Sequence, residues 1–234
     1  VNTLGISTLF DITPGIGYTA PPILTVSSPS VGVNTAIITA TLGISTFTVT
    51  NPGSGYITSP SLSISPAVTG FSFQVGLGVT STGSVLVGGS GYVSAPTVSF
   101  SMPAIGINSA TASVTNITST AISEITITNV GSGYTVIPTV TITGGGGSNA
   151  SFTIGQMKVA NVSILSRGFG ITTPPVISIV AGGSGGVGAA VSYSMGIGSR
   201  INITGFGTGY NTAPSIGVTA VDGITGSGAA MNVG

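Results

Sequence analysis

The side chains that could carry out chemistry are few in this sequence. The carboxylates are Asp11, Glu124 and Asp222, and Cys, His and Trp are absent from all 234 residues. Without Cys or His the chain has no thiol or imidazole to act as nucleophile, general base or zinc ligand. Two carboxylates about 5 to 10 Å apart could hydrolyse a glycosidic bond, but these three lie far apart in sequence. We therefore predict a protein that is not an enzyme, with no catalytic, metal-binding or cofactor-binding residues and no cofactor.

Glycine-rich segments at 144–147 and 182–186 resemble phosphate-binding loops in composition. No lysine follows either segment, and a P-loop requires that lysine to reach the phosphates. We interpret both segments as loops that close β-hairpins.

Charge is scarce. Lys158, Arg167 and Arg200 balance the three carboxylates, so charged residues make up 3% of the chain, whereas soluble domains carry about 25%. A surface with so little charge favours association, so we expect copies of this chain or other structural subunits to bind through strand edges and uncapped ends. The sequence has no basic stripe for nucleic acid, and its glycine-interrupted alternation argues against membrane insertion.

A motif, Gly-x-Gly-[Tyr/Ile]-x-x-x-Pro, recurs six times, and we expect it to set the positions of the strands that carry the remaining side chains. Its fourth residue, which we call the anchor, recurs every 36 to 42 residues, and such a fixed period indicates a repeat protein. The motif residues, which we predict to be structural, are Gly15, Gly17, Tyr18 and Pro22; Gly53, Gly55, Tyr56 and Pro60; Gly89, Gly91, Tyr92 and Pro96; Gly131, Gly133, Tyr134 and Pro138; Gly168, Gly170, Ile171 and Pro175; and Gly207, Gly209, Tyr210 and Pro214.

Apolar and small polar residues alternate around each anchor, which is typical of half-buried strands. Three such runs occur in each unit. The glycines suit turn positions that need a positive φ, and the proline, which lacks an N–H, marks the start of the second strand. We expect the anchor tyrosine to pack over the turn and its hydroxyl to reach backbone or solvent.

These patterns predict an all-β fold, because charged helix formers are nearly absent while β-branched residues, Ser and Thr dominate. We expect a tandem array of six three-stranded repeats of ~38 residues, folded as a meander within each unit or as a parallel β-solenoid. A closed array of six blades is a further alternative. The predicted units are 1–47, which includes the start of the next strand, 48–83, 84–124, 125–161, 162–200 and 201–234.

Two departures from the pattern lead to further expectations. Asp11 occupies a phase held by apolar residues elsewhere, so we expect a bulge that turns Phe10 and Ile12 inward. The units fill the chain from one end to the other without caps, so we expect a fragment of a longer or processed polypeptide whose ends neighbours cover.

The repeats read Thr-Val-Thr-Asn-Pro-Gly-Ser-Gly-Tyr at 48–56 and Gly-Ser-Gly-Tyr-Thr-Val-Ile-Pro at 131–138. They resemble the Gly-Ser-Gly-Tyr repeats of large structural proteins from tailed bacteriophages, especially marine cyanophages, and of some bacterial surface proteins. The resemblance covers the whole chain. It implies a structural component of a fibre, tail or other virion appendage, located in the virion, with multivalent binding to cell-surface glycan as an added role. The alternatives are a bacterial extracellular filament or adhesin at the cell surface, and a polysaccharide depolymerase spike.

Overall fold

The computed structural model describes residues 4–181, 185–221 and 226–233. These residues form strands and no helix, and strands make up 62% of the structure, which confirms the all-β prediction. The strands are β1 (Leu9–Ile16), β2 (Ile23–Val26), β3 (Ile37–Ser54), β4 (Ser61–Ser65), β5 (Thr69–Val79), β6 (Ser84–Ser90), β7 (Thr97–Phe100), β8 (Thr111–Thr118), β9 (Ala121–Asn129), β10 (Val140–Thr143), β11 (Ser148–Thr153), β12 (Met157–Phe169), β13 (Val176–Val180), β14 (Val187–Gly205), β15 (Ile216–Thr219) and β16 (Ser227–Val233).

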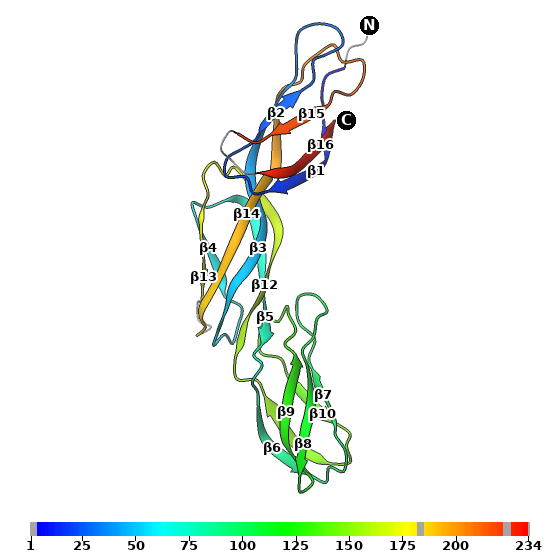
Figure 1. The fold of residues 1–234 in the computed structure, drawn as a ribbon, viewed down its shortest axis with the longest axis vertical. Helices are drawn as coiled ribbons and strands as arrows, with labels where there is room; N and C mark the ends of the chain where they lie inside the picture. The colour runs from blue at the N-terminus through cyan, green and yellow to red at the C-terminus, as the bar shows by residue number, and fades with distance from the viewer. Residues whose placement is uncertain (1–3, 182–184, 222–225, 234) are drawn as a thin grey trace.

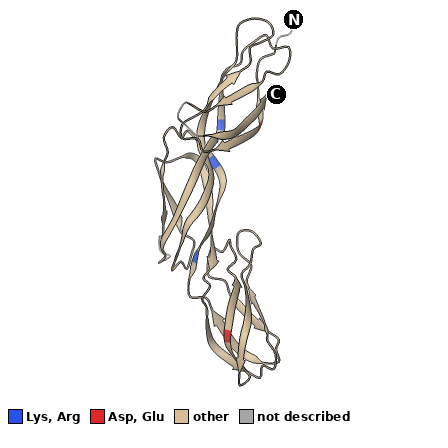
Figure 2. Ribbon diagram, in the orientation of Figure 1, with Lys and Arg blue, Asp and Glu red and all other residues tan. Residues whose placement is uncertain are grey.

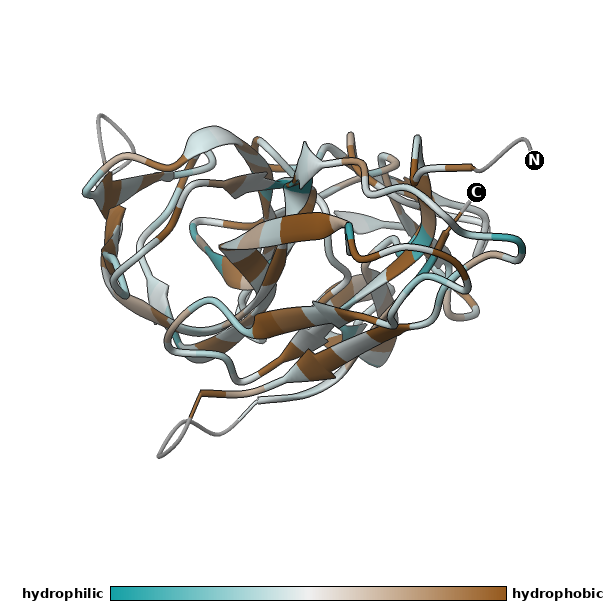
Figure 3. Ribbon diagram, turned by 90° about the horizontal axis from the view of Figure 1, so that it is seen from above, coloured by the Kyte–Doolittle hydropathy of each residue, from teal (hydrophilic) through white to brown (hydrophobic). Residues whose placement is uncertain are grey.

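The alternation in the sequence becomes alternation in burial. In β4, Leu62 and Ile64 are half-buried while the three serines of the strand are exposed, and Figure 3, viewed along the long axis, shows brown and pale residues alternating along many strands. Successive side chains of a strand point to opposite faces, so each strand covers the interior with one face. Each second strand begins one or two residues after its motif proline, from Ile23 after Pro22 to Ile216 after Pro214, as expected.

The strands pair in reverse order along the chain. Strands β1 to β8 each pair, antiparallel, with a strand from β16 to β9: β1 with β16, β2 with β15, β3 with β14, β4 with β13, β5 with β12, β6 with β11, β7 with β10 and β8 with β9. The second half of the chain therefore returns alongside the first half, as in one very long hairpin.

This pairing differs from the predicted architectures. Among the described strands, sequence neighbours pair only at β7–β8 and β8–β9, so a meander within each unit is wrong, and the antiparallel ladders exclude a parallel solenoid. The sheets are open, which excludes the closed array. The tandem organisation of six units is not confirmed, and strands β3, β9, β12 and β14 run through predicted unit boundaries.

The predicted hairpin loop at 144–147 is also wrong. It joins β10 and β11, and these strands pair with β7 and β6 respectively. Each of these two strands instead hydrogen-bonds to a strand of the opposite half. Of the second predicted hairpin loop, residues 182–184 lie outside the described residues; the segment leads from β13 to β14, which pair with β4 and β3.

The molecule is elongated (Figure 1), with both chain ends at one end and the β8–β9 hairpin at the other. We call these the terminal end and the tip. Leu4 and Val233 line the same cavity at the terminal end. At the tip, Ser119 and Thr120 form a two-residue turn with φ of 51° and 64°, the conformation of a type I′ hairpin turn.

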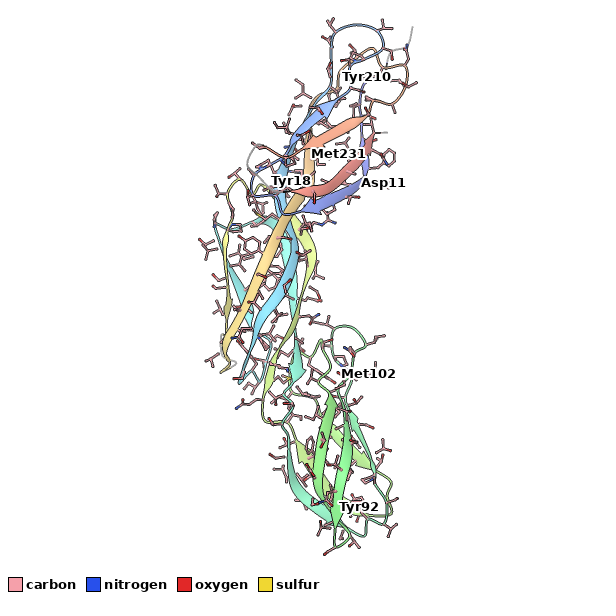
Figure 4. All side chains as sticks on the ribbon, viewed as in Figure 1. Asp11, Tyr18, Tyr92, Met102, Tyr210 and Met231 are labelled. Carbon is pink, nitrogen blue, oxygen red and sulfur yellow. The ribbon has the colours of Figure 1, made fainter. Side chains whose placement is uncertain are left out.

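The core is divided along this length into separate clusters. The largest includes Tyr56, Leu77, Tyr134 and Met157, and further clusters surround Tyr18, Ile38 and Tyr210. Figure 4 shows anchors Tyr210, Tyr18 and Tyr92 at successive positions from the terminal end to the tip. Each stretch of the rod therefore has its own interior.

The expected bulge at Asp11 is present. The β1–β16 register shifts between Phe10 and Thr13, and Asp11 has a φ of 52°. Ile12 turns inward as expected, but Phe10 is 46% exposed and Leu9 takes the second inward position. The prediction for Phe10 was wrong because the bulge interrupts the alternation of inward and outward side chains after Leu9. Phe10 and Asp11 therefore both point outward before Ile12 turns inward.

Candidate functional site

The motif residues form six structurally similar turns. Both glycines of each motif have a positive φ, between 61° and 92°, as the sequence predicted. L-residues with a side chain adopt this region at a cost of roughly 1–2 kcal/mol. The values are 61° and 82° at Gly15 and Gly17, 61° and 83° at Gly53 and Gly55, 66° and 80° at Gly89 and Gly91, 62° and 84° at Gly131 and Gly133, 65° and 84° at Gly168 and Gly170, and 65° and 92° at Gly207 and Gly209.

The first glycine of a motif also lies against backbone from the opposite half of its strand pair. A Cβ built on Gly131 would lie 2.5 Å from the amide nitrogen of Ala110, and one built on Gly207 would lie 2.6 Å from that of Ala36. A Cβ on Gly133 would overlap the carbonyl oxygen of Ile105. Gly131, Gly133 and Gly207 therefore serve two purposes, a left-handed turn and a close approach between backbones.

The anchors are buried and tie the two halves together. Each anchor donates its backbone N–H to a carbonyl on the opposite half, with N···O distances between 2.9 and 3.4 Å: Tyr18 to Met195, Tyr56 to Met157, Tyr92 to Thr120, Tyr134 to Leu77, Ile171 to Leu42 and Tyr210 to Leu4. Such bonds satisfy buried backbone groups that would otherwise be costly.

Two anchor hydroxyls reach backbone, as expected. The hydroxyl of Tyr134 accepts a hydrogen bond from the Ala110 N–H at 2.8 Å, and that of Tyr210 accepts one from the Ala36 N–H at 2.9 Å. Within the described residues, the hydroxyl of Tyr92 has no such partner. Its ring instead packs on Gly147, where a Cβ would lie 2.5 Å from Tyr92 Cγ.

The exception at Ile171 follows from the segment opposite it. Tyr134 and Tyr210 face the long connections 101–110 and 27–36, which supply the amides that their hydroxyls bind. The connection opposite Ile171, between β4 and β5, spans only 66–68. A small cavity there is lined by Ile171, Val68 and Pro66 among others, so an aliphatic side chain replaces the phenol.

Sequence reasoning missed a second repeated segment. Residues 29–36 read Pro-Ser-Val-Gly-Val-Asn-Thr-Ala and residues 103–110 read Pro-Ala-Ile-Gly-Ile-Asn-Ser-Ala. Comparing units 1 and 3 directly would have revealed them. Each segment covers an anchor of the opposite half, and each exposes an apolar side chain, Val33 at 92% and Ile107 at 87%.

The candidate catalytic carboxylates do not converge. Asp11 lies on β1, which belongs to the terminal part of the rod, and Glu124 lies on β9 near the tip. Asp222 lies outside the described residues. Within 4–181, 185–221 and 226–233, no group of three acidic, His or Cys residues could hold a metal ion.

Charged and titratable groups are correspondingly isolated. Figure 2 shows a ribbon that is tan almost throughout. In the described part of the chain, no carboxylate lies within 4.0 Å of Lys158, Arg167 or Arg200, and the Arg200 guanidinium stacks over the Phe169 ring at 4.9 Å. Burial raises the pKa of the Tyr193 phenol, whose hydroxyl donates to the carbonyl of Pro175.

Comparison of the chain with protein-family models, curated proteins and solved structures finds no match. The described residues include no helix of the length and apolarity needed to span a membrane.

Proposed function

We propose that this chain is a non-enzymatic structural rod that projects from a larger assembly, attached at its terminal end, as part of a virion tail, fibre or other appendage. The observation that carries the proposal is the reverse-order strand pairing. It gives an elongated molecule whose two chain ends share one end of the rod and whose other end is a closed hairpin.

The recurring turns support a finer description of the rod. The strands around anchors 1, 2 and 3 pair with those around anchors 6, 5 and 4. Four of the anchor hydrogen bonds, those donated by Tyr18, Tyr56, Tyr134 and Ile171, instead reach the neighbouring pair and join unit 1 with unit 5 and unit 2 with unit 4. We describe the chain as six units folded back into three stacked pairs, because two units together can bury faces that one unit leaves exposed.

The terminal end offers a surface for attachment. An apolar cavity of about 180 Å³ is lined there by Leu4, Ile6, Tyr210 and Val233, among others. Leu4 and Phe206 are 64% and 63% exposed. Apolar side chains gathered at one end mark a surface that another protein can cover, and we propose another structural subunit of the assembly as that partner, with further copies of the chain associating at strand edges.

The depolymerase alternative gains no support from the arrangement of Asp11 and Glu124, which lie toward opposite ends of the rod. A bacterial filament or adhesin would also suit a rod with one attached end, so the experiment must separate these two contexts.

Cryo-electron microscopy of the native assembly tests the proposal. Because the chain lacks cysteine, a single cysteine at Ser119 or at Thr212 can carry a gold label at the tip or at the terminal end. We expect density for virion proteins joined to the terminal end and the Ser119 label at the outer surface. A Thr212 label at the outer surface would contradict the attachment, and a filament built without virion proteins would favour the bacterial alternative.

A further inference from the structure

Two of the three cations in the chain, Arg167 and Arg200, lie on strands that approach one another closely where β3, β12 and β14 cross. The backbones approach closely there, because a Cβ on Gly43 of β3 would lie 2.6 Å from the carbonyl oxygen of Gly168 in β12. The Ser199 hydroxyl of β14 donates to the same carbonyl at 3.1 Å. Arg167 precedes Gly168, and Arg200 follows Ser199, so the crossing brings the two arginines to one region.

Irregularities in both strands shape this region. In the β3–β14 ladder, Ile197 faces Leu42 and Ile201 faces Ala40, so residues 198–200 face Thr41 alone. The β12–β5 ladder also shifts between Ile164 and Ser166. Bulges redirect side chains out of the regular alternation and are over-represented next to functional sites.

Two open grooves adjoin at Ser199. One, of about 470 Å³, is lined by Ser45, Ile164, Leu165, Ser166, Arg167 and Ser199. The other, of about 350 Å³, is lined by Arg200 and Ser199 with Ser7, Thr8, Leu9, Ile12, Ile201 and Ile203. Together they combine two guanidinium groups, several hydroxyls and aliphatic side chains. We call them the arginine groove.

The arginines of this groove are not neutralised within the described residues. No carboxylate lies within ion-pair distance of either one. Asp11 is on β1 near Leu9 and Ile12, but it does not line the groove, and its carboxylate accepts a hydrogen bond from the Asn232 side chain at 3.5 Å. The Arg200 guanidinium is already held over Phe169, so less freedom is lost when it binds a ligand.

We propose that the arginine groove binds an acidic polysaccharide, with carboxylate or sulfate groups of successive residues at Arg167 and Arg200. Guanidinium pairs with such groups through two parallel hydrogen bonds. The serine hydroxyls match sugar hydroxyls, and the aliphatic side chains match the C–H faces of sugar rings. Two cations are too few for nucleic acid, whose binding proteins neutralise many phosphates.

This inference rests on the proposed function only for its setting, since a rod projecting from a virion would meet such polymers at a host surface. The binding itself is tested separately. Absence of polysaccharide binding would leave the attachment proposal standing, and failure of the attachment proposal would leave measured binding unexplained but intact.

The test is isothermal titration calorimetry of the full chain with alginate, a polyuronate, and with neutral dextran of similar length. We expect binding of alginate at least tenfold tighter than dextran, and a loss of about tenfold for each of Arg167→Gln and Arg200→Gln. Lys158→Gln is the matched control, because it removes the remaining positive charge outside the groove. It should leave the affinity nearly unchanged.

Several outcomes would overturn the proposal. These are equal affinity for alginate and dextran, an equal loss in Lys158→Gln, or tighter arginine-dependent binding to phosphatidylglycerol vesicles than to alginate. Arg167→Lys and Arg200→Lys keep the charge but not the guanidinium fork. These lysine variants show whether weaker binding comes from the lost guanidinium or from unfolding of the chain. We expect them to bind alginate with intermediate affinity and to have an unchanged melting temperature.

Discussion

A disulfide between β3 and β14 gives the sharpest test of the reverse-order pairing. Thr46 and Ser194 are opposite one another in that ladder, with their hydroxyl oxygens 2.6 Å apart. Residues 148 positions apart in sequence can form a disulfide only if the chain returns alongside itself. In a tandem array of self-contained units they would lie about four units apart. The absence of native cysteine makes Thr46→Cys/Ser194→Cys unambiguous.

The expected magnitude follows from the size of the loop that the bond closes. Chain entropy predicts stabilisation of about 5 kcal/mol for a loop of 148 residues. Thr111 and Thr128, whose hydroxyl oxygens lie 2.8 Å apart, are a matched pair with a separation of 17 residues, for which the same relation gives about 3 kcal/mol. Both pairs join antiparallel strands through partly or fully exposed hydroxyl residues, Thr46 opposite Ser194 and Thr128 in a bulge next to Asn129, the ladder partner of Thr111. The difference of about 2 kcal/mol comes from the longer loop that the reverse-order pairing closes.

The assay is non-reducing electrophoresis with thiol counting, followed by urea unfolding of oxidised and reduced forms. We expect both disulfides to form, and the 46–194 bond to stabilise more than the 111–128 bond. Thr46→Cys/Thr111→Cys, on strands that do not pair, should stay reduced. If the 46–194 bond failed to form while the 111–128 bond formed, the reverse-order pairing would be refuted.

Three further predictions concern single side chains. Gly133→Ala should lower the free energy of unfolding in urea by about 3 kcal/mol or more, because the added methyl would overlap a backbone carbonyl. Gly170→Ala, with the same φ of 84° but open space around it, should lower it by only about 1–2 kcal/mol. Equal losses would argue against the close approach at Gly133. Tyr134→Phe should cost about 1–2 kcal/mol by leaving a buried amide unpaired, and Tyr92→Phe much less, so a similar melting temperature for the two variants would contradict the hydrogen bond. Burial raises the pKa of Tyr193, so the folded state retains the phenol proton while the unfolded state loses it near pH 10. The stability due to Tyr193 is therefore complete below that pH and declines as pH rises through it. The free energy of unfolding, followed from pH 8 to 11, should fall less in Tyr193→Phe than in the unsubstituted chain.

Local features of the fold were predictable because local physics determines them. A positive φ at Gly53 or Gly131 follows from a recurring Gly-x-Gly turn, and the strand start after Pro60 follows from the missing N–H. The bulge at Asp11 followed from a charged residue in an apolar phase. In each case the conformation depends on residues a few positions apart.

The pairing partners were not predictable in the same way. Alternating strands such as β4 and β10 offer the same half-buried face to any antiparallel partner, so periodicity does not say which strand lies opposite. The positions of glycines outside the motif could not be explained from the sequence for the same reason. Gly43 and Gly147 lack side chains because a distant carbonyl and a distant ring lie against them, and their reason becomes visible only when the two halves are together.

The arginine groove was missed for a related reason. Arg167 and Arg200 are isolated in sequence and belong to different predicted units, so neither forms a motif. They share a region only because β14 crosses β12, and the bulge at 198–200 becomes visible only in the ladder with β3. Sites assembled from strands of opposite halves leave little trace in local sequence.

The irregular positions explain how similar strands find the correct partners. The two-residue turn at Ser119 and Thr120 makes β8 and β9 neighbours at almost no loop-closure cost, and each completed pair brings the next two strands together. We expect pairing to proceed from the tip toward the terminal end. The differences among units then fix the register, because long connections face Tyr134 and Tyr210 while the short connection at 66–68 faces Ile171. A shift by one unit would place a phenol over the short connection and leave the amides of the long ones unpaired, so the single departure from tyrosine helps to specify the pairing.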